Sequence, residues 1–132
     1  MFLSKLSLNE KKAFLKIAHH VARSDDDFSE KQKMIIDQYC DEMSINDIDF
    51  DEKQFNLYSE LEQILDSESQ KIILLELMAL VYSDDLLHES EKEVLDAMVK
   101  DFGLTEDVIN IYTQWSKSMI ALMSQASSLI KL

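Results

Sequence analysis

The sequence predicts an all-α protein, a compact bundle of about six helices, from three observations. The 132 residues contain no proline and one glycine, Gly103, and tight β-turns and hairpins depend on those two residue types. Apolar side chains recur at intervals of three and four residues along most of the chain, which is the period of an amphipathic helix. Signals for a helix start precede most of these apolar stripes.

Four helix starts are predicted from a capping box, in which a side chain accepts a hydrogen bond from a backbone amide and a residue three positions later reaches back. The four matching pairs are Ser7 with Glu10, Ser29 with Gln32, Asp49 with Glu52, and Ser67 with Gln70. Thr105 is a further candidate cap, and Gly103 stands where a left-handed residue would end a helix. Helices are therefore expected over residues 8–23, 30–43, 50–66, 68–83, 89–102 and 106–130.

One apolar stripe per helix predicts the core of a single domain that spans residues 1–132. The run from Ile72 to Val81 is apolar nearly all round, so its helix should be the central one. The other expected core residues are Phe14, Ile17, Ala18, Val21, Met34, Ile35, Tyr39, Leu57, Leu61, Ile64, Leu65, Val94, Leu95, Met98 and Phe102.

The predicted last helix, over residues 106–130, is about 37 Å long, more than a domain of this size needs. Its apolar stripe continues almost to the C-terminus. One interpretation is a helix that wraps across and closes the bundle, with Trp115 as a packing anchor. The other is that its far end reaches beyond the core to pair with a second copy or a partner helix. Its methionines suit such an adaptable contact surface.

Charge excludes some functions. The net charge is −13, and residues 24–68 hold 15 acidic residues against three lysines, so this region repels nucleic acid. The N-terminus resembles no secretion signal, and no apolar run is long enough to span a bilayer. A cytoplasmic protein without membrane insertion is expected. The single cysteine, Cys40, excludes an internal disulfide and a multi-cysteine zinc site, and we expect a packed or surface thiol.

An internal repeat is predicted at a separation of 59 residues. "SDDDFSEKQKMIIDQYCDEMSI" from Ser24 aligns without a gap on "SDDLLHESEKEVLDAMVKDFGL" from Ser83. Each copy consists of an apolar helix, an acidic turn, an amphipathic helix and a small-residue stop. The two halves, about 8–45 and 68–104, would be helical hairpins related by an approximate two-fold rotation that brings their apolar faces together.

These acidic turns are similar to those of the TerB-like, tellurite-resistance-associated family. The family motif has an Asp in an Ala-Asp-Gly-like turn and a Glu seven residues later, present twice. The matching residues are Asp25 and Asp84, with Glu91 in the second copy but Gln32 in the first. The resemblance covers about residues 10–125. It implies a helical fold, divalent-metal binding by acidic side chains in some members, and no enzymatic activity.

The second acidic turn is the better candidate for a cation site. A bend between Asp84 and Glu91 can bring two carboxylates together, with Asp85 as a further ligand and Asp25 and Asp26 as their counterparts in the first copy. Oxygen ligands of this kind suit Ca²⁺, Mg²⁺ or Mn²⁺. The spacing does not fit an EF-hand. The alternative without metal is that these acids neutralise the positive start of the following helix.

The sequence supports two main functional hypotheses. The first is a non-catalytic TerB-like module that binds a divalent cation and serves a stress-response or membrane-associated complex. The second is a protein-interaction domain without metal, which uses the long C-terminal helix and forms a homodimer through it. A metal-dependent hydrolase ranks below both, because no base or substrate clamp is recognisable. The adjacent His19 and His20 point about 100° apart on a helix, so an ordinary, partly exposed pair is expected.

Overall fold

The described part of the chain is helical. The computed structural model of the protein describes residues 1–24, 28–82 and 89–132, and within these ranges it contains helices and no strand. A short 3-10 helix, Leu3–Lys5, precedes the first α-helix. The α-helices are α1 (Leu8–Ala22), α2 (Glu30–Met43), α3 (Leu57–Leu61), α4 (Ser67–Val81), α5 (Glu89–Asp101) and α6 (Glu106–Ile130). The all-helical prediction is confirmed.

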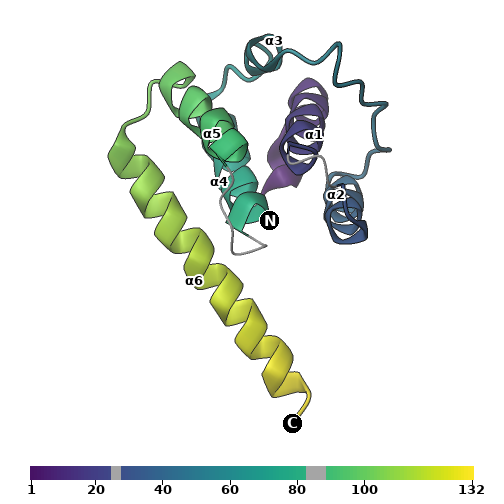
Figure 1. Ribbon diagram of the computed structural model, residues 1–132, viewed down its shortest axis with the longest axis vertical. Coiled ribbons are helices and arrows are strands. Elements are labelled where there is room, and N and C mark those ends of the chain that lie inside the picture. The colour runs from purple at the N-terminus through teal and green to yellow at the C-terminus, as the bar shows by residue number, and fades with distance from the viewer. Residues whose placement is uncertain (25–27, 83–88) are drawn as a thin grey trace.

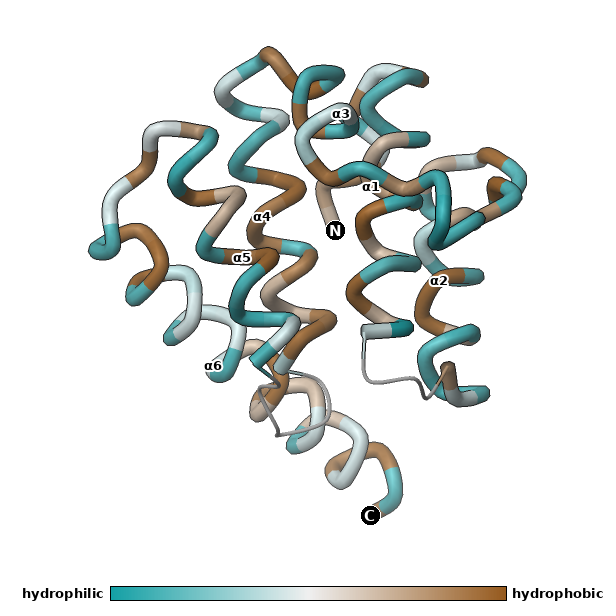
Figure 2. The backbone as a smooth tube through the Cα atoms, turned by 45° about the horizontal axis from the view of Figure 1, so that its top comes forward, coloured by the Kyte–Doolittle hydropathy of each residue, from teal (hydrophilic) through white to brown (hydrophobic). Residues whose placement is uncertain are grey.

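Two helical hairpins form the body of the molecule (Figure 1). α1 packs against α2, α4 packs against α5, and α1 and α4 contact each other between them. α3 lies on α1, and α6 lies on α4. Neighbours on several sides explain why α4 is apolar nearly all round, as Figure 2 shows by the hydrophobic colour along much of its length.

The core forms where the two hairpins meet. Phe14 and Ile17 of α1 and Leu74 and Leu77 of α4 have no exposed surface, and burying each such side chain contributes about 1.5–3 kcal/mol. Most predicted core residues are buried or packed against the core. Two are not: Met34 is 60% exposed and Leu65 is 83% exposed, so both predictions are wrong.

Two buried carboxylates inside the body have hydrogen-bond partners. Glu10 of α1 accepts a hydrogen bond from the Ser69 hydroxyl of α4 at 3.0 Å. The carboxylate of Glu76, also on α4, accepts one from the amino group of Met1. Buried carboxylates destabilise a fold unless they are paired in this way. The polar contacts therefore fix how α4 sits against α1 and the start of the chain.

Helix starts and ends follow the local sequence signals. Ser7 with Glu10 and Ser29 with Gln32 form capping boxes, as predicted. At α4 the cap is Asp66, whose side chain accepts from the backbone amide of Ser69 at 3.0 Å, in place of the predicted Ser67.

The predicted helix over residues 50–66 is wrong. Residues 46–56 are not helical, and the only helix there is the five-residue α3. Asn56 caps α3 through a hydrogen bond from the Ser59 amide. Asp49 and Glu52, the expected capping box, lie in the non-helical segment, which curves around α1 on its way from α2 to α3 (Figure 1).

The two hairpins match in position along the chain. α4 begins and ends 59 residues after α1, and α5 begins 59 residues after α2. α2 is followed by Ser44 with φ 56°, and α5 is followed, again 59 residues later, by Gly103 with φ 69°. Both ends carry the same pair of backbone hydrogen bonds, which is the Schellman pattern.

Candidate functional site

Four of the five predicted metal ligands, Asp25, Asp26, Asp84 and Asp85, lie outside the described residues. The fifth, Glu91, is in the first turn of α5 and is 5% exposed. Within residues 1–24, 28–82 and 89–132, no three carboxylates, histidines or cysteines gather as metal ligands would. The metal site stays a prediction.

Gln32, the counterpart of Glu91 in the first hairpin, has a structural role. Its side-chain oxygen accepts a hydrogen bond from the backbone amide of Ser29 at 3.0 Å, and the Ser29 hydroxyl accepts from the backbone amide of Gln32 at 3.2 Å. This reciprocal pair satisfies two amides at the start of α2. The amide side chain therefore stabilises the helix start.

The two histidines of α1 hold the non-helical segment 46–56. Nε2 of His19 lies 2.9 Å from Oδ1 of Asp47, and Nδ1 of His20 lies 2.7 Å from Oε1 of Glu52. His19 is only 4% exposed, so the expectation of a partly exposed residue is wrong for it. Each of the two rings has its own carboxylate partner.

Aromatic rings extend this contact into a cluster. The His19 ring stacks on Phe50 with centroids 5.4 Å apart, and the His20 ring stacks on Phe55 at 4.4 Å. The guanidinium of Arg23 lies 4.0 Å from the centroid of the Phe28 ring. At this distance the positive charge is attracted to the face of the aromatic ring. These contacts explain why residues 46–56 cross α1 without forming a helix.

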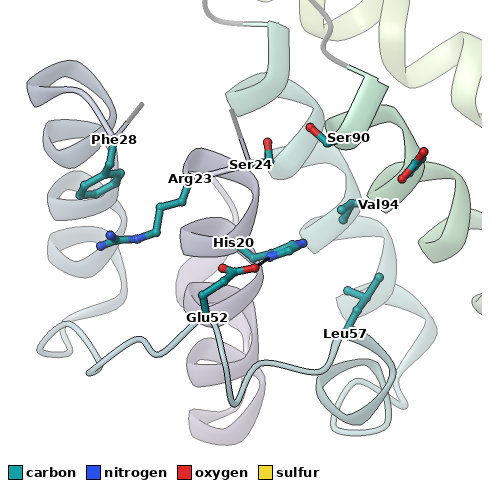
Figure 3. Close-up of a pocket in the computed structure, with 9 residues that line it drawn as sticks. His20, Arg23, Ser24, Phe28, Glu52, Leu57, Ser90 and Val94 are labelled. Atoms are coloured by element: carbon teal, nitrogen blue, oxygen red, sulfur yellow. Dashed lines mark hydrogen bonds and ion pairs between the residues drawn. The ribbon is translucent and has the colours of Figure 1, made fainter. Parts of the chain in front are cut away.

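A cavity of about 680 Å³ opens between α1, α3 and α5 (Figure 3). Figure 3 shows the His20–Glu52 pair at its centre, while Arg23 points away toward Phe28. The Ser24 hydroxyl donates to the backbone carbonyl of Val21 at 2.8 Å, so this hydroxyl is engaged. The lining residues are His20, Arg23, Ser24, Phe28, Glu52, Leu57, Ser90, Glu93 and Val94.

The chemistry of this cavity is that of a paired acid and base. A nucleophile in such a site needs a hydrogen bond to its base. In the described part of the chain no hydroxyl is bonded to the His20 ring; its polar partner there is Glu52. The His20–Glu52 pair joins α1 to segment 46–56.

α6 offers a second candidate surface, because it leaves the body halfway along its length. Ser116 is fully buried and Ile109 and Tyr112 pack against the core, so the first half is anchored. Residues 121–132, which we call the distal segment, are all exposed. Figure 1 shows this segment projecting past the other helices to the C-terminus, and Figure 2 shows hydrophobic residues continuing along it.

One face of α6 carries large apolar side chains along its whole length. Ile111, Trp115, Leu122 and Leu129, which we call the α6 stripe, are 63%, 38%, 63% and 67% exposed. Their spacings of four and seven residues place them on one side of a helix. Met123 and Ile130 add further exposed apolar surface in the distal segment. Trp115 is therefore half-exposed, and the expected role as a packing anchor is wrong.

Comparison with known proteins adds no further assignment. No family model, curated protein or solved structure matches the chain. The described helices also include none with the length and apolar character required to cross a membrane. Among the described helices, α6 is the longest.

Proposed function

We propose that this protein is a non-catalytic interaction module that binds a protein partner through α6. The observation that carries this proposal is the distal segment, in which Leu122, Met123, Leu129 and Ile130 are each more than 60% exposed. Single exposed apolar residues are ordinary, but a contiguous apolar surface of this kind is typical of a contact site.

The body supports the proposal because it is complete without the distal segment. We propose that the chain contains a duplicated unit of three elements, one over residues 7–61 and the other over residues 66–120. The matching helix bounds, helix ends and the buried contact between Glu10 and Ser69, themselves 59 residues apart, favour this duplication.

The duplication also defines where the fold ends. α3 packs on α1 in the first unit as α6 packs on α4 in the second. The last residue of α3, Leu61, matches Ile120, and every residue after Ile120 is exposed. The distal segment therefore lies beyond the second unit, where it makes no contribution to the core. An apolar helix without a role in the core is expected to have one in association.

Truncation tests this function. A chain that ends at Ile120 should stay folded, and its free energy of unfolding should stay within about 0.5 kcal/mol of the full chain in dilute solution, because only exposed residues are removed. Ile109→Ala, on the body side of α6, is the control and should cost about 1–3 kcal/mol. Urea unfolding followed by circular dichroism gives both values. A truncated chain that unfolds would show that the distal segment belongs to the fold.

A divalent-cation site is the second candidate function. The observation that favours it is Glu91, a buried carboxylate in the first turn of α5, at the position where the TerB-like resemblance implies a ligand. The resemblance also implies a place in a stress-response or membrane-associated complex. In this proposal Asp84 and Asp85 supply the remaining carboxylates.

Thermal unfolding in millimolar calcium or manganese tests the cation site. Binding to the folded state must raise the midpoint. The double variant Asp84→Asn with Glu91→Gln should lose this rise, while Glu93→Gln, an exposed carboxylate of the same helix, should keep it. An unchanged midpoint in the wild-type protein would remove the metal from the proposal.

A further inference from the structure

The α6 stripe has the shape of a surface that can pair with itself. Along the helix, large side chains stand at Ile111, Trp115, Leu122 and Leu129, with small or narrow ones at Ser118 and Ala126. When a second helix is placed antiparallel, residues whose numbers add up to about 240 become neighbours. Ile111 then faces Leu129 of the other copy, Trp115 faces Ala126, and Ser118 faces Leu122. Bulky residues meet small ones in the inner layers, as close helix packing requires.

We propose that the partner of α6 is a second copy of this chain, bound by antiparallel pairing of the two α6 stripes. This inference rests on the proposed function and names its partner. A two-fold axis near residue 120 makes the contact isologous, so that both copies use the same surface.

The body leaves room for this contact. At about 100° per residue, the stripe lies about a third of a turn from the face that carries Ile109 and Ser116, which packs on the body. A second helix can therefore approach the stripe without displacing α4.

Charge favours the antiparallel arrangement. Residues 108–132 carry Lys117 and Lys131 and no acidic residue, while the whole chain has a net charge of −13. Antiparallel pairing places the two acidic bodies at opposite ends of the helix pair, and the distal segment of each copy, which has no acidic side chain, lies beside α6 of the other copy. Parallel pairing would bring the two acidic bodies together, where like charges repel. The stripe itself is uncharged, so no charge is buried in the contact.

The area is sufficient for a weak dimer. Half the circumference of a helix about 11 Å across, over about 30 Å of length, is roughly 500 Å² for each copy. The total of about 1,000 Å² is at the lower limit for a specific interface. Interfaces of this size are typical of weak, transient contacts, so the dimer should dissociate on dilution.

Sedimentation of the full chain from about 1 μM to about 500 μM measures this equilibrium. Leu122→Glu buries an unpaired charge in the contact and should raise the dissociation constant at least about 100-fold. Ser124→Glu is the matched control: it adds the same charge to the opposite side of α6, and the dimer should persist. Equal weakening by both variants, or no weakening by Leu122→Glu, would overturn the inference.

Cysteine pairing tests the orientation. In a Cys40→Ala background, Ile111→Cys and Leu129→Cys chains are mixed and oxidised. Antiparallel pairing predicts a mixed disulfide that joins one chain of each kind, because these positions face each other. Disulfides only between identical chains would mean parallel pairing and overturn the proposal.

Failure of this inference is distinguishable from failure of the proposed function. The full chain could stay monomeric up to about 500 μM while the chain ending at Ile120 remains folded. This result would overturn the proposal that the partner is a second copy, and the partner of α6 would then be another protein. Binding of the monomer to neutral lipid vesicles would likewise overturn it, in favour of a membrane surface. An unfolded truncated chain overturns the proposed function itself.

Discussion

At the residue scale, the clearest chemical expectation concerns Cys40, which is buried on α2. Burial is the main cause that raises the pKa of this thiol to about 11, and the nearby carboxylates of Asp47, Asp37 and Asp41 raise it further. Because the thiolate is the reactive form, the thiol should be inert at neutral pH.

Labelling with an aromatic disulfide reagent at about pH 8 measures this. The folded chain should react at least about 100-fold more slowly than the chain in denaturant, because a pKa raised by about two units lowers the thiolate fraction that much. The raised pKa stabilises the fold below the ordinary thiol range, and this contribution disappears as the pH rises through about 11. A native rate within about threefold of the denatured one would contradict this.

Residue patterns predicted local contacts better than distant ones. The capping box of Ser7 with Glu10 involves residues three positions apart, so the sequence is sufficient to find it. The partners of His19 and His20 lie 28 and 32 residues away, and no local pattern points to them. The sequence shows only that Asp47 and Glu52 belong to a strongly acidic segment, and such a segment could contact many different surfaces of the protein.

At the element scale, the ends of α2 and α5 make a matched prediction. Ser44 and Gly103 both have positive φ, which costs about 1 kcal/mol for residues other than glycine. Ser44→Gly should therefore raise the free energy of unfolding by about 0.5–1 kcal/mol, and Gly103→Ala should lower it by about 1 kcal/mol. No atom within 4 Å would meet a Cβ at Gly103, so the cost there is backbone strain alone.

Urea unfolding of the two single variants measures whether the free energy of unfolding rises for Ser44→Gly and falls for Gly103→Ala. The dependence of the free energy on urea should be the same in both, because neither change alters the surface that unfolding exposes. A Ser44→Gly variant that is destabilised would contradict the assignment of this position as a left-handed helix end.

The difference between local and tertiary contacts also explains which helices the sequence could predict. α1, α2, α4, α5 and α6 begin within a residue of the predicted positions. At α1, α2 and α4 a side-chain cap acts within one turn of the helix start, whereas Thr105 before α6 makes no such hydrogen bond. The helix expected over residues 50–66 fails because Phe50, Glu52 and Phe55 have partners on α1 that compete with helix formation. That competition is tertiary, so local propensity does not reveal it.

At the scale of the whole molecule, α6 shows the limit of periodicity. Its bounds and its stripe follow from the sequence, but the same stripe would suit a helix covered by the body or one that projects from it. The position of the body decides between these two arrangements of α6, because the body covers one side of the helix only as far as Ile120. The duplication that we propose, with a separation of 59 residues between its two units, places the end of the second unit at the same residue.

Hydrogen exchange of the α6 backbone amides, measured across a dilution series, tests the central claim most directly. The distal segment is fully exposed, so its helical hydrogen bonds can open locally without disturbing the body. We therefore predict fast exchange at residues 121–130 below about 1 μM and at least about 100-fold protection near 500 μM, with Leu122→Glu removing the protection. Amides around Ser116 should be protected throughout. Protection of residues 121–130 that is independent of concentration and of Leu122→Glu would contradict association through α6.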